Sequence, residues 1–253
     1  MTHPIVIENL CDMVDACRAR IDDVVEDNTD DLSGSNLALL QQASVDQDAD
    51  NRLWSFNELA LFANEAVREV AIRTKCIREN TSALAVHSIA AADVGNPWIA
   101  LDSRVLQIKR ARWEGKPIGL AWRHQLDEGQ TDWESEQSDG EKYLVFDSGA
   151  REFRLYPHPS VDGTLTLDVV REPISKMVEP NDVPEVPQKY LFGAINWMCH
   201  LAYQKMDSET ANPQLADRFE TVFERQFGGR LSEVLLFQDT YATPRNRARI
   251  HWF

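Results

Sequence analysis

Apolar residues recur three or four positions apart in four stretches of the chain, which is the spacing of one helix face. This pattern predicts helices within residues 5–25, 56–78, 187–206 and 213–227. The second helix opens with a capping box, in which the side chains of Ser55, just before the helix, and Glu58, in its first turn, each bond the unpaired backbone N–H of the other. The fourth begins with Asn212 and Pro213, a favoured N-cap and first helical residue, and Gly228 follows its last apolar position.

Between residues 81 and 173 the helical period gives way to short segments rich in β-forming residues. These segments, at residues 84–89, 98–101, 105–113, 143–146, 153–156 and 164–171, are separated by glycine, proline and asparagine or aspartate turns. Leu165, Leu167 and Val169 alternate with polar residues, as expected of a strand with one buried face. The tight-turn pair Asp162 and Gly163 predicts a hairpin over residues 153–171. We therefore expect an antiparallel β module.

The fold class predicted from these patterns is α+β. Four prolines, Pro173, Pro180, Pro184 and Pro187, indicate a stiff irregular connection after the β module. No single helical stripe can bury itself, so the early and late helices are expected to pack together as a bundle from which the β module projects. We assign residues 1–80 and 174–238 to the bundle, 81–173 to the β module and 239–253 to an extended tail.

Composition narrows the classes of function. The chain has 41 acidic and 26 basic residues, a formal charge of −15, and 43% apolar residues with seven tryptophans, enough for a core. Such acidity argues against a nucleic-acid groove and against binding to an anionic membrane. The cysteines Cys11, Cys17, Cys76 and Cys199 lack paired spacing, which favours free thiols in a reducing compartment. No basic leader or membrane-length apolar run stands out, so we expect a cytoplasmic protein without a membrane partner.

The last fourteen residues are basic, whereas the chain as a whole is acidic. Residues 240–253 contain three arginines and no acid, and they end in apolar and aromatic residues. The candidate docking residues are Arg245, Arg247, Arg249, Ile250, Trp252 and Phe253. Arginine and tryptophan are enriched at interface anchor points, and exposed aromatics are otherwise an aggregation liability. A frayed chain end is the alternative, but we favour docking on another protein.

A search for catalytic patterns predicts no enzyme, no cofactor and no metal site. There is no glycine-rich phosphate loop. Cys199 and His200 are adjacent, and neighbouring helix residues face about 100° apart, so they do not converge on one metal ion. His87, His124 and His158 have no nucleophile motif nearby and are interpreted as structural or exposed.

A glycan-binding or glycan-cleaving site is the remaining chemical alternative. Two of the carboxylates Asp127, Glu128, Asp132, Glu134 and Glu136 could flank a sugar bond, but a solvated acidic loop explains them more simply. Trp113, Trp122 and Trp133 could form a carbohydrate platform. Trp113 and Trp122 are more simply the core or rim of the β module, because large aromatics fill small β domains.

Several phrases of the sequence resemble a known family. They are LWSFNEL at residues 53–59, NEAVRE at 64–69, RLYP at 154–157 with GTL at 163–165, VPQKY at 186–190 and AYQK at 202–205. Together with the order of elements, they are similar to tailed-bacteriophage head-to-tail adaptor proteins of the tail tubular protein A and podovirus connector type. The likeness covers residues 30–229 and consists of structural rather than catalytic motifs.

This resemblance implies a structural role in the virion, at the head-to-tail junction, after assembly in the host cytoplasm. It implies a homo-oligomeric ring of about twelve subunits beneath the portal protein, which continues the DNA channel without binding DNA specifically and offers a platform for a tail or nozzle protein. The C-terminal segment would dock into the portal. An acidic body that repels phosphate suits such a channel, and a closed ring needs two different surfaces on each subunit.

Three other functions remain open from the sequence alone. The nearest is a tail-side completion or tail tube protein. A glycan-cleaving accessory protein would use the acids and tryptophans of residues 113–136. A binding or regulatory module would stay monomeric and would not bind a portal.

Overall fold

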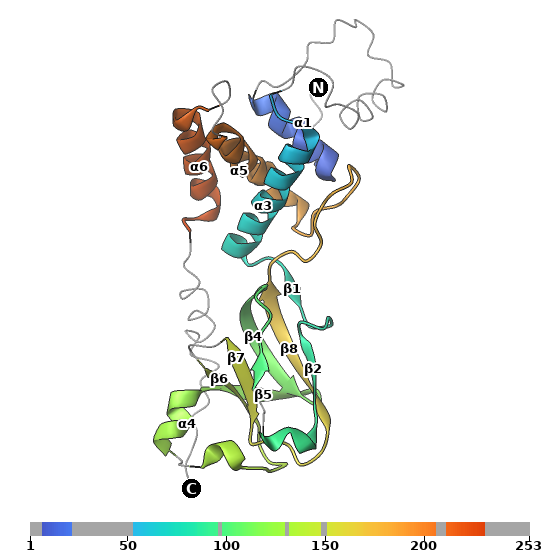
Figure 1. The fold of residues 1–253 in the computed structure, drawn as a ribbon, viewed down its shortest axis with the longest axis vertical. Coiled ribbons are helices and arrows are strands. Elements are labelled where there is room, and N and C mark those ends of the chain that lie inside the picture. The colour runs from blue at the N-terminus through green and yellow to red at the C-terminus, as the bar shows by residue number, and fades with distance from the viewer. Residues whose placement is uncertain are drawn as a thin grey trace, which may run out of the picture. The chain divides into compact units, whose positions relative to one another are not determined.

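The computed structural model describes residues 7–21, 53–95, 98–129, 132–147, 151–205 and 211–230 (Figure 1). These residues form two compact units. The helical unit consists of the described residues up to Cys76 together with residues 173–230, and the β unit runs from Ile77 to Glu172. The fold is therefore α+β, as the sequence predicted.

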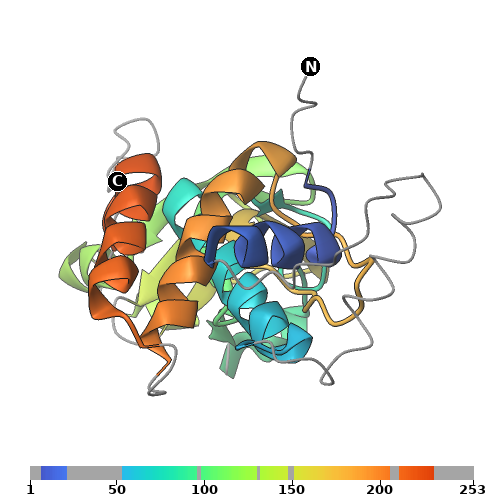
Figure 2. The ribbon, with the colours of Figure 1, turned by 90° about the horizontal axis from the view of Figure 1, so that it is seen from above.

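The helical unit is built around one central helix. Its elements are α1 (Leu10–Ile21), α3 (Phe56–Thr74), the short 3-10 helix η3 (Gln188–Tyr190), α5 (Leu191–Gln204) and α6 (Pro213–Phe227). Helix α5 contacts each of α1, α3 and α6, and Figure 2 shows it lying between them. Because α5 is covered on several sides, even Asn196 and His200 are buried along with its apolar residues. The four helices predicted from apolar spacing are confirmed.

The caps predicted from the sequence set two of the helix starts. The Ser55 amide donates to Glu58 Oε2 at 3.0 Å, and the Glu58 amide donates to Ser55 Oγ at 3.3 Å, so the capping box forms. Helix α6 is capped by Asn212, whose Oδ1 accepts from the Leu215 amide at 3.2 Å. Helix α3 ends four residues before the predicted position 78, because Lys75 adopts a left-handed conformation with a φ of 53°.

The proline-rich connection of residues 173–187 is held by hydrogen bonds. Asp182 Oδ2 accepts from the Val178 and Glu179 amides at 2.7 and 2.8 Å. The Leu10 amide donates to the Asp182 carbonyl and the Cys11 amide to the Pro180 carbonyl, both at 2.9 Å. These two bonds satisfy N–H groups that the first turn of α1 leaves without a helical partner.

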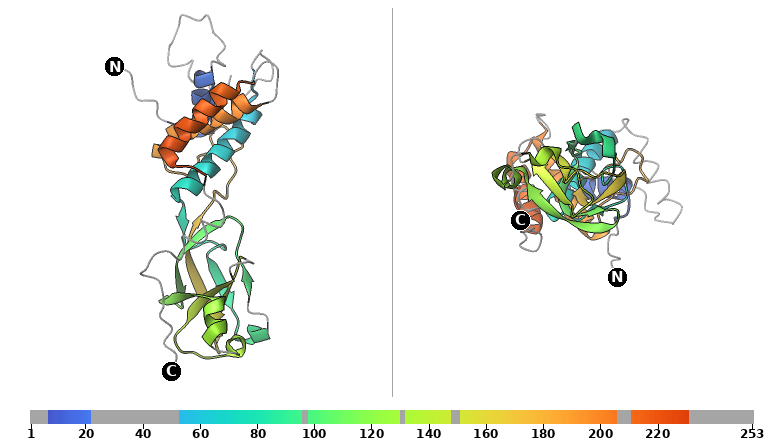
Figure 3. Two further views of the ribbon diagram at one scale, coloured as in Figure 1. Left: turned by 90° about the vertical axis from the view of Figure 1, so that its left-hand side faces the viewer. Right: turned by 90° about the horizontal axis from the view of Figure 1, so that it is seen from below.

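The β unit is an eight-stranded mixed sheet that curls into a half-barrel (Figure 3). Its strands are β1 (Arg78–Glu79), β2 (Val86–Ile89), β3 (Ile99–Ala100), β4 (Val105–Trp113), β5 (Lys116–Trp122), β6 (Tyr143–Asp147), β7 (Glu152–Tyr156) and β8 (Gly163–Arg171). Their order is β1-β8-β4-β5-β6-β7-β3, and β2 also pairs with β8. Helix α4 (Arg123–Gly129) and two 3-10 helices, η1 (Ala91–Gly95) and η2 (Trp133–Ser135), complete the unit.

The prediction of a purely antiparallel module was wrong, because β5 and β6 run parallel. Strand β5 was missed in the sequence, where Gly115, Lys116 and Pro117 were interpreted only as a separator. Pro117 lies near the start of β5 opposite Arg112, a place where a strand tolerates a proline. Parallel neighbours need a crossover, and α4 and η2 lie in the connection from β5 to β6.

The predicted hairpin over residues 153–171 was also wrong. Strand β7 pairs with β6 and β3, whereas β8 pairs with β4, β1 and β2. The connection that contains Asp162 therefore links two halves of the sheet. Local turn chemistry was a poor guide here, because tertiary pairing decides which strands become neighbours.

Two apolar clusters fill the β unit. The larger lies within the curled sheet and includes Ile108, Phe146, Phe153 and Leu167, with Trp113 and Trp122 partly buried against it. The interpretation of those two tryptophans as core or rim is confirmed. The smaller cluster packs the region of α4 and η2 against the sheet; its members are Ala121, Leu126, Trp133, Val145 and Tyr156.

Candidate interaction surfaces

The predicted docking residues cannot be placed in this structure. Arg245, Arg247, Arg249, Ile250, Trp252 and Phe253 all lie outside the described residues. Their role therefore stays a prediction. The described chain ends at Arg230, just beyond α6.

The end of α6 is fixed by one buried arginine. The Arg73 guanidinium lies 4.7 Å from the centroid of the Phe223 ring and 5.2 Å from that of Trp197. Its Nε donates to Glu69 Oε2 at 3.1 Å, and its Nη1 donates to the Gly228 carbonyl. Only 1% of the Arg73 side chain is exposed, so these contacts work with little screening by water. They join the C-terminal end of α3 to that of α6.

Large apolar side chains are exposed on several elements of the helical unit. They are Leu53, Leu61, Ile174, Val178, Val183, Phe192 and Val222. Phe192 is partly covered by Arg20, whose guanidinium lies 4.4 Å from the ring centroid and whose Nη1 donates to Asn196 Oδ1 at 2.6 Å. Singly exposed apolar residues are common on protein surfaces, so these residues do not by themselves define a binding site.

A β-bulge places two basic residues together on the surface of the β unit. The register of β4 against β8 shifts between Ile108, opposite Val169, and Arg110, opposite Asp168. Two β4 residues therefore span a single step of β8, which breaks the strict in-and-out alternation. As a result, both Lys109 and Arg110 are exposed.

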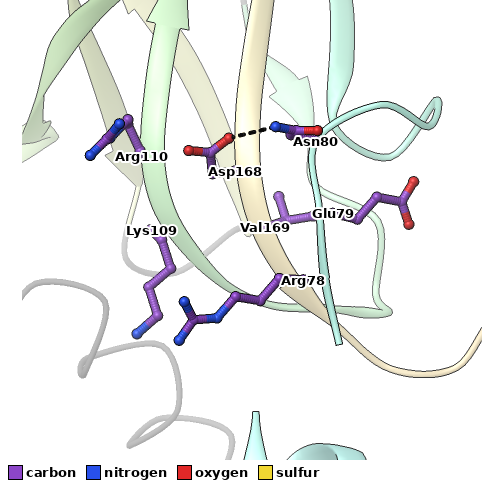
Figure 4. Close-up of a pocket in the computed structure, with 7 residues that line it drawn as sticks. All are labelled: Arg78, Glu79, Asn80, Lys109, Arg110, Asp168 and Val169. Carbon is purple, nitrogen blue, oxygen red and sulfur yellow. Dashed lines mark hydrogen bonds between the residues drawn. The ribbon is translucent and has the colours of Figure 1, made fainter. Parts of the chain in front are cut away.

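This bulge borders a pocket of about 390 Å³ on the sheet. The pocket is lined by Arg78, Glu79, Asn80, Lys109, Arg110, Asp168 and Val169 (Figure 4). Figure 4 shows the charged ends of Arg78 and Lys109 directed toward the same side. We call Arg78, Lys109 and Arg110 the basic face.

The carboxylates of the pocket already have partners. Asp168 accepts a hydrogen bond from Asn80 Nδ2 at 3.2 Å and lies 3.6 Å from Arg112 Nη2. Hydrogen bonds from Ser82, and then the pairing with Arg171, lower the pKa of the Glu79 carboxyl group; the Ser82 amide donates to it at 2.9 Å. The side chains of Arg78 and Arg110 make no hydrogen bond or ion pair with another described residue.

The acids predicted in the loop region form a second, oppositely charged surface. Residues 127–141, with a gap at 130–131 in the description, carry Asp127, Glu128, Asp132, Glu134, Glu136, Asp139 and Glu141. We call them the acidic segment. Arg123 offsets part of the negative charge of this segment: its Nη1 donates to Asp147 at 2.9 Å and its Nη2 donates to Glu134 at 3.2 Å.

Two of these carboxylates serve the small core of the β unit. Trp133, which is 2% exposed, donates from its indole nitrogen to Asp127 at 2.8 Å. The Tyr156 hydroxyl donates to Glu136 at 2.7 Å, and burial together with this bond raises the pKa of Tyr156. Trp133 is thus a core residue, not part of an exposed carbohydrate platform. The sequence interpreted these acids as a solvated loop; Asp127 instead lies on α4, and both Asp127 and Glu136 hydrogen-bond side chains of the small core.

The remaining chemical candidates have structural partners. His200 Nδ1 lies 2.9 Å from the Ala216 carbonyl, and His158 Nε2 lies 3.1 Å from the Ala90 carbonyl. Burial lowers the pKa of His87. Within the described ranges, no three His, Cys, Asp or Glu side chains form a group that could hold a metal ion. None of the helices described there has the length and apolar character needed to span a membrane.

Comparison with known proteins decides the family. The SU10 adaptor protein family matches residues 35–249 of the chain. The chain belongs to this family of phage head-to-tail adaptors. Its role is therefore that of an adaptor, or connector, and adaptors are structural proteins. No curated protein matches the chain.

The extent of the family match bears on both ends of the chain. The SU10 adaptor match begins before α3 and includes every later described element, but it leaves out α1. At the other end it includes Arg245, Arg247 and Arg249 and stops before Ile250, Trp252 and Phe253. The basic part of the predicted docking segment is thus within the matched region.

Sequence reasoning missed the basic face of this SU10 adaptor family member. Residues 105–113 were predicted as a strand, but Lys109 and Arg110 were not singled out. Two adjacent cations in the middle of a predicted strand were the available sign, because strict alternation would direct one of them inward. Arg78 could not be added from the sequence, since it reaches the same pocket only through the pairing of β1 with β8.

Proposed function

We propose that this SU10 adaptor forms a closed ring that joins the portal protein to a tail or nozzle protein and continues the DNA channel. The family match over residues 35–249 is the observation that carries the proposal, because it assigns the chain to phage head-to-tail adaptors. Twelve copies are the expected number, by the resemblance to connector proteins. The formal charge of −15 suits a passage through which DNA slides without being held.

The docking segment supplies the contact with the portal in this proposal. Arg245, Arg247 and Arg249 would pair with carboxylates of the portal, since a guanidinium group can form bidentate hydrogen bonds with a carboxylate. Ile250, Trp252 and Phe253 would fill apolar clefts beside them, and aromatic residues are frequent interface anchors.

The proposal is tested by sedimentation of the purified chain with the portal from the same genome. The full-length chain is compared with one that ends at Gln238 and with a variant carrying serine at Arg245, Arg247 and Arg249. The matched control replaces three other arginines, Arg68, Arg218 and Arg225, with serine; they lie exposed on α3 and α6.

The full-length chain and the control should join the portal in a heavier ring, and the other two variants should not. Undiminished binding by the shortened chain would refute the docking role of the segment. If the full-length chain does not bind the portal but binds a tail protein, the adaptor acts on the tail side as a completion protein.

A further inference from the structure

The β unit carries two surfaces of opposite charge on different halves of its sheet. The basic face lies on β1 and β4, which flank β8 near one end of the strand order. The acidic segment lies in the crossover between β5 and β6, farther along that order. Each copy of the chain therefore presents both signs of charge on one unit.

The sheet backbone holds the basic face in place. Arg78 lies opposite Val170 in the pairing of β1 with β8. The bulge in β4 determines the positions of Lys109 and Arg110. Like charges that line one pocket repel one another unless an anion offsets them. Arg78 and Arg110 have no hydrogen-bond or ion-pair partner among the described residues, so a carboxylate from a second copy would not have to displace one of those residues.

The acidic segment has an excess of negative charge. The cations beside it are engaged: Arg123 bonds Asp147 and Glu134, the buried Arg154 donates to the Glu134 carbonyl, and Lys142 is 4% exposed and donates to the Ser138 carbonyl. Glu128 and Asp132 remain exposed, and their side chains form no hydrogen bond or ion pair with another residue that the structure describes.

We propose that the basic face of one copy binds the acidic segment of the next copy, as the contact that repeats around the ring. The inference rests on the proposed function, and it names the residues of the subunit contact. If each copy binds one neighbour through its basic face and another through its acidic segment, the contact is heterologous, the kind that generates rings. A contact in which the basic face of one copy met the basic face of another would bring like charges together.

A second copy fits the basic face better than DNA does. Glu79 and Asp168 also line the pocket, which would weaken the attraction of a dense row of phosphates. A few carboxylates on a protein segment can instead be spaced to meet Arg78 and Arg110 individually.

The test is a charge exchange between two variants. The first carries Arg78→Glu and Arg110→Glu, and the second carries Glu128→Arg and Asp132→Arg. A control carries Arg218→Glu and Arg225→Glu, which changes the net charge as the first variant does but lies on α6. Circular dichroism checks that each variant is folded. Assembly is followed by sedimentation, with and without the portal, and binding to duplex DNA is measured in parallel.

Wild type and control should assemble, whereas each exchange variant alone should need at least a tenfold higher concentration. An equimolar mixture of the two variants should regain assembly, because every contact then pairs opposite charges again. Assembly of the first variant at wild-type concentrations would overturn the inference and leave the adaptor function standing. Loss of DNA binding by that variant, with assembly intact, would assign the basic face to phosphate contacts instead.

Two further outcomes are also decisive. If both variants fail alone and the mixture fails as well, these two surfaces do not bind each other. If wild type forms no oligomer with or without the portal, both the ring and this contact are wrong.

Discussion

Asn64 and Met177 are joined by two hydrogen bonds, although 113 positions separate them in the chain. Asn64 Nδ2 donates to the Met177 carbonyl, and the Met177 amide donates to Asn64 Oδ1, both at 2.8 Å. The side chain thus pairs with the backbone as a neighbouring strand would. This relationship attaches the proline-rich connection to α3, where the connection has no regular secondary structure to satisfy its polar groups.

Replacing Asn64 with alanine should lower the free energy of unfolding by about 2 kcal/mol, because two backbone groups of Met177 lose their partner. Urea denaturation followed by circular dichroism measures the change. Asn57→Ala is the matched control: it removes the same side chain from an exposed position of α3 and should change stability by less than about 0.5 kcal/mol. Equal effects of the two substitutions would contradict the bridge.

Arg73→Met should destabilise the helical unit by about 3 kcal/mol, because it leaves Glu69 and the Gly228 carbonyl without their buried donor. Thermal or urea unfolding measures this loss. Arg225→Met is the control, since Arg225 lies exposed on α6. A loss of less than about 1 kcal/mol for Arg73→Met would show that the arginine does not join α3 to α6.

Gly163→Ala should destabilise the β unit by about 1–3 kcal/mol, since an added methyl group overpacks the site. A Cβ at Gly163 would lie 2.4 Å from Cζ2 of the Trp113 ring, which is held against the sheet core. A Cβ at Gly229 meets no atom within 4 Å, so Gly229→Ala serves as the control. If Gly163→Ala is neutral or stabilising in urea denaturation, the close approach of Trp113 is wrong.

Asp102 should make stability depend on pH in the acid range. The Arg104 side chain, and then the Arg104 amide, bond its carboxylate and lower the pKa of Asp102 from 3.8 to about 2. A depressed pKa means that the contribution is complete above pH 3.8 and is lost as the pH falls toward 2. Wild type should therefore exceed Asp102→Asn in unfolding free energy at pH 5, and the gap should close on acidification.

This pH effect is measured by urea denaturation of both proteins across the acid range. In an Arg104→Ala background the gap at pH 5 should be smaller, because the largest cause of the pKa shift is gone. A gap that stays constant between pH 5 and pH 2 would exclude the proposed bonds of Asp102.

Much of the fold was predictable from local patterns, because local patterns determine helices and caps. The capping box at Ser55 and the proline at Pro213 gave the starts of α3 and α6. Strand β4 was predicted with its observed limits. The mixed sheet was not predictable, since the parallel pairing of β5 with β6 depends on a crossover that brings together distant residues. The same limit explains the wrong hairpin after Pro157.

The interaction surfaces were predictable only in part. The acids around Glu128 were apparent from composition, and so was the basic character of residues 240–253. The basic face was not, because a β-bulge and a long-range strand pairing bring Arg78 to Lys109 and Arg110. The likeness to head-to-tail adaptors came from structural phrases, and the SU10 adaptor match confirms it.

The central claim is the proposal that this SU10 adaptor joins the portal to the tail and docks on the portal through residues 239–253. Cross-linking mass spectrometry of intact virions tests it most directly, because the cross-links report neighbours in the assembled particle. The account predicts cross-links from residues 239–253 to the portal protein, and cross-links between two copies of the chain. Cross-links from that segment to tail proteins alone, with none to the portal, would contradict it.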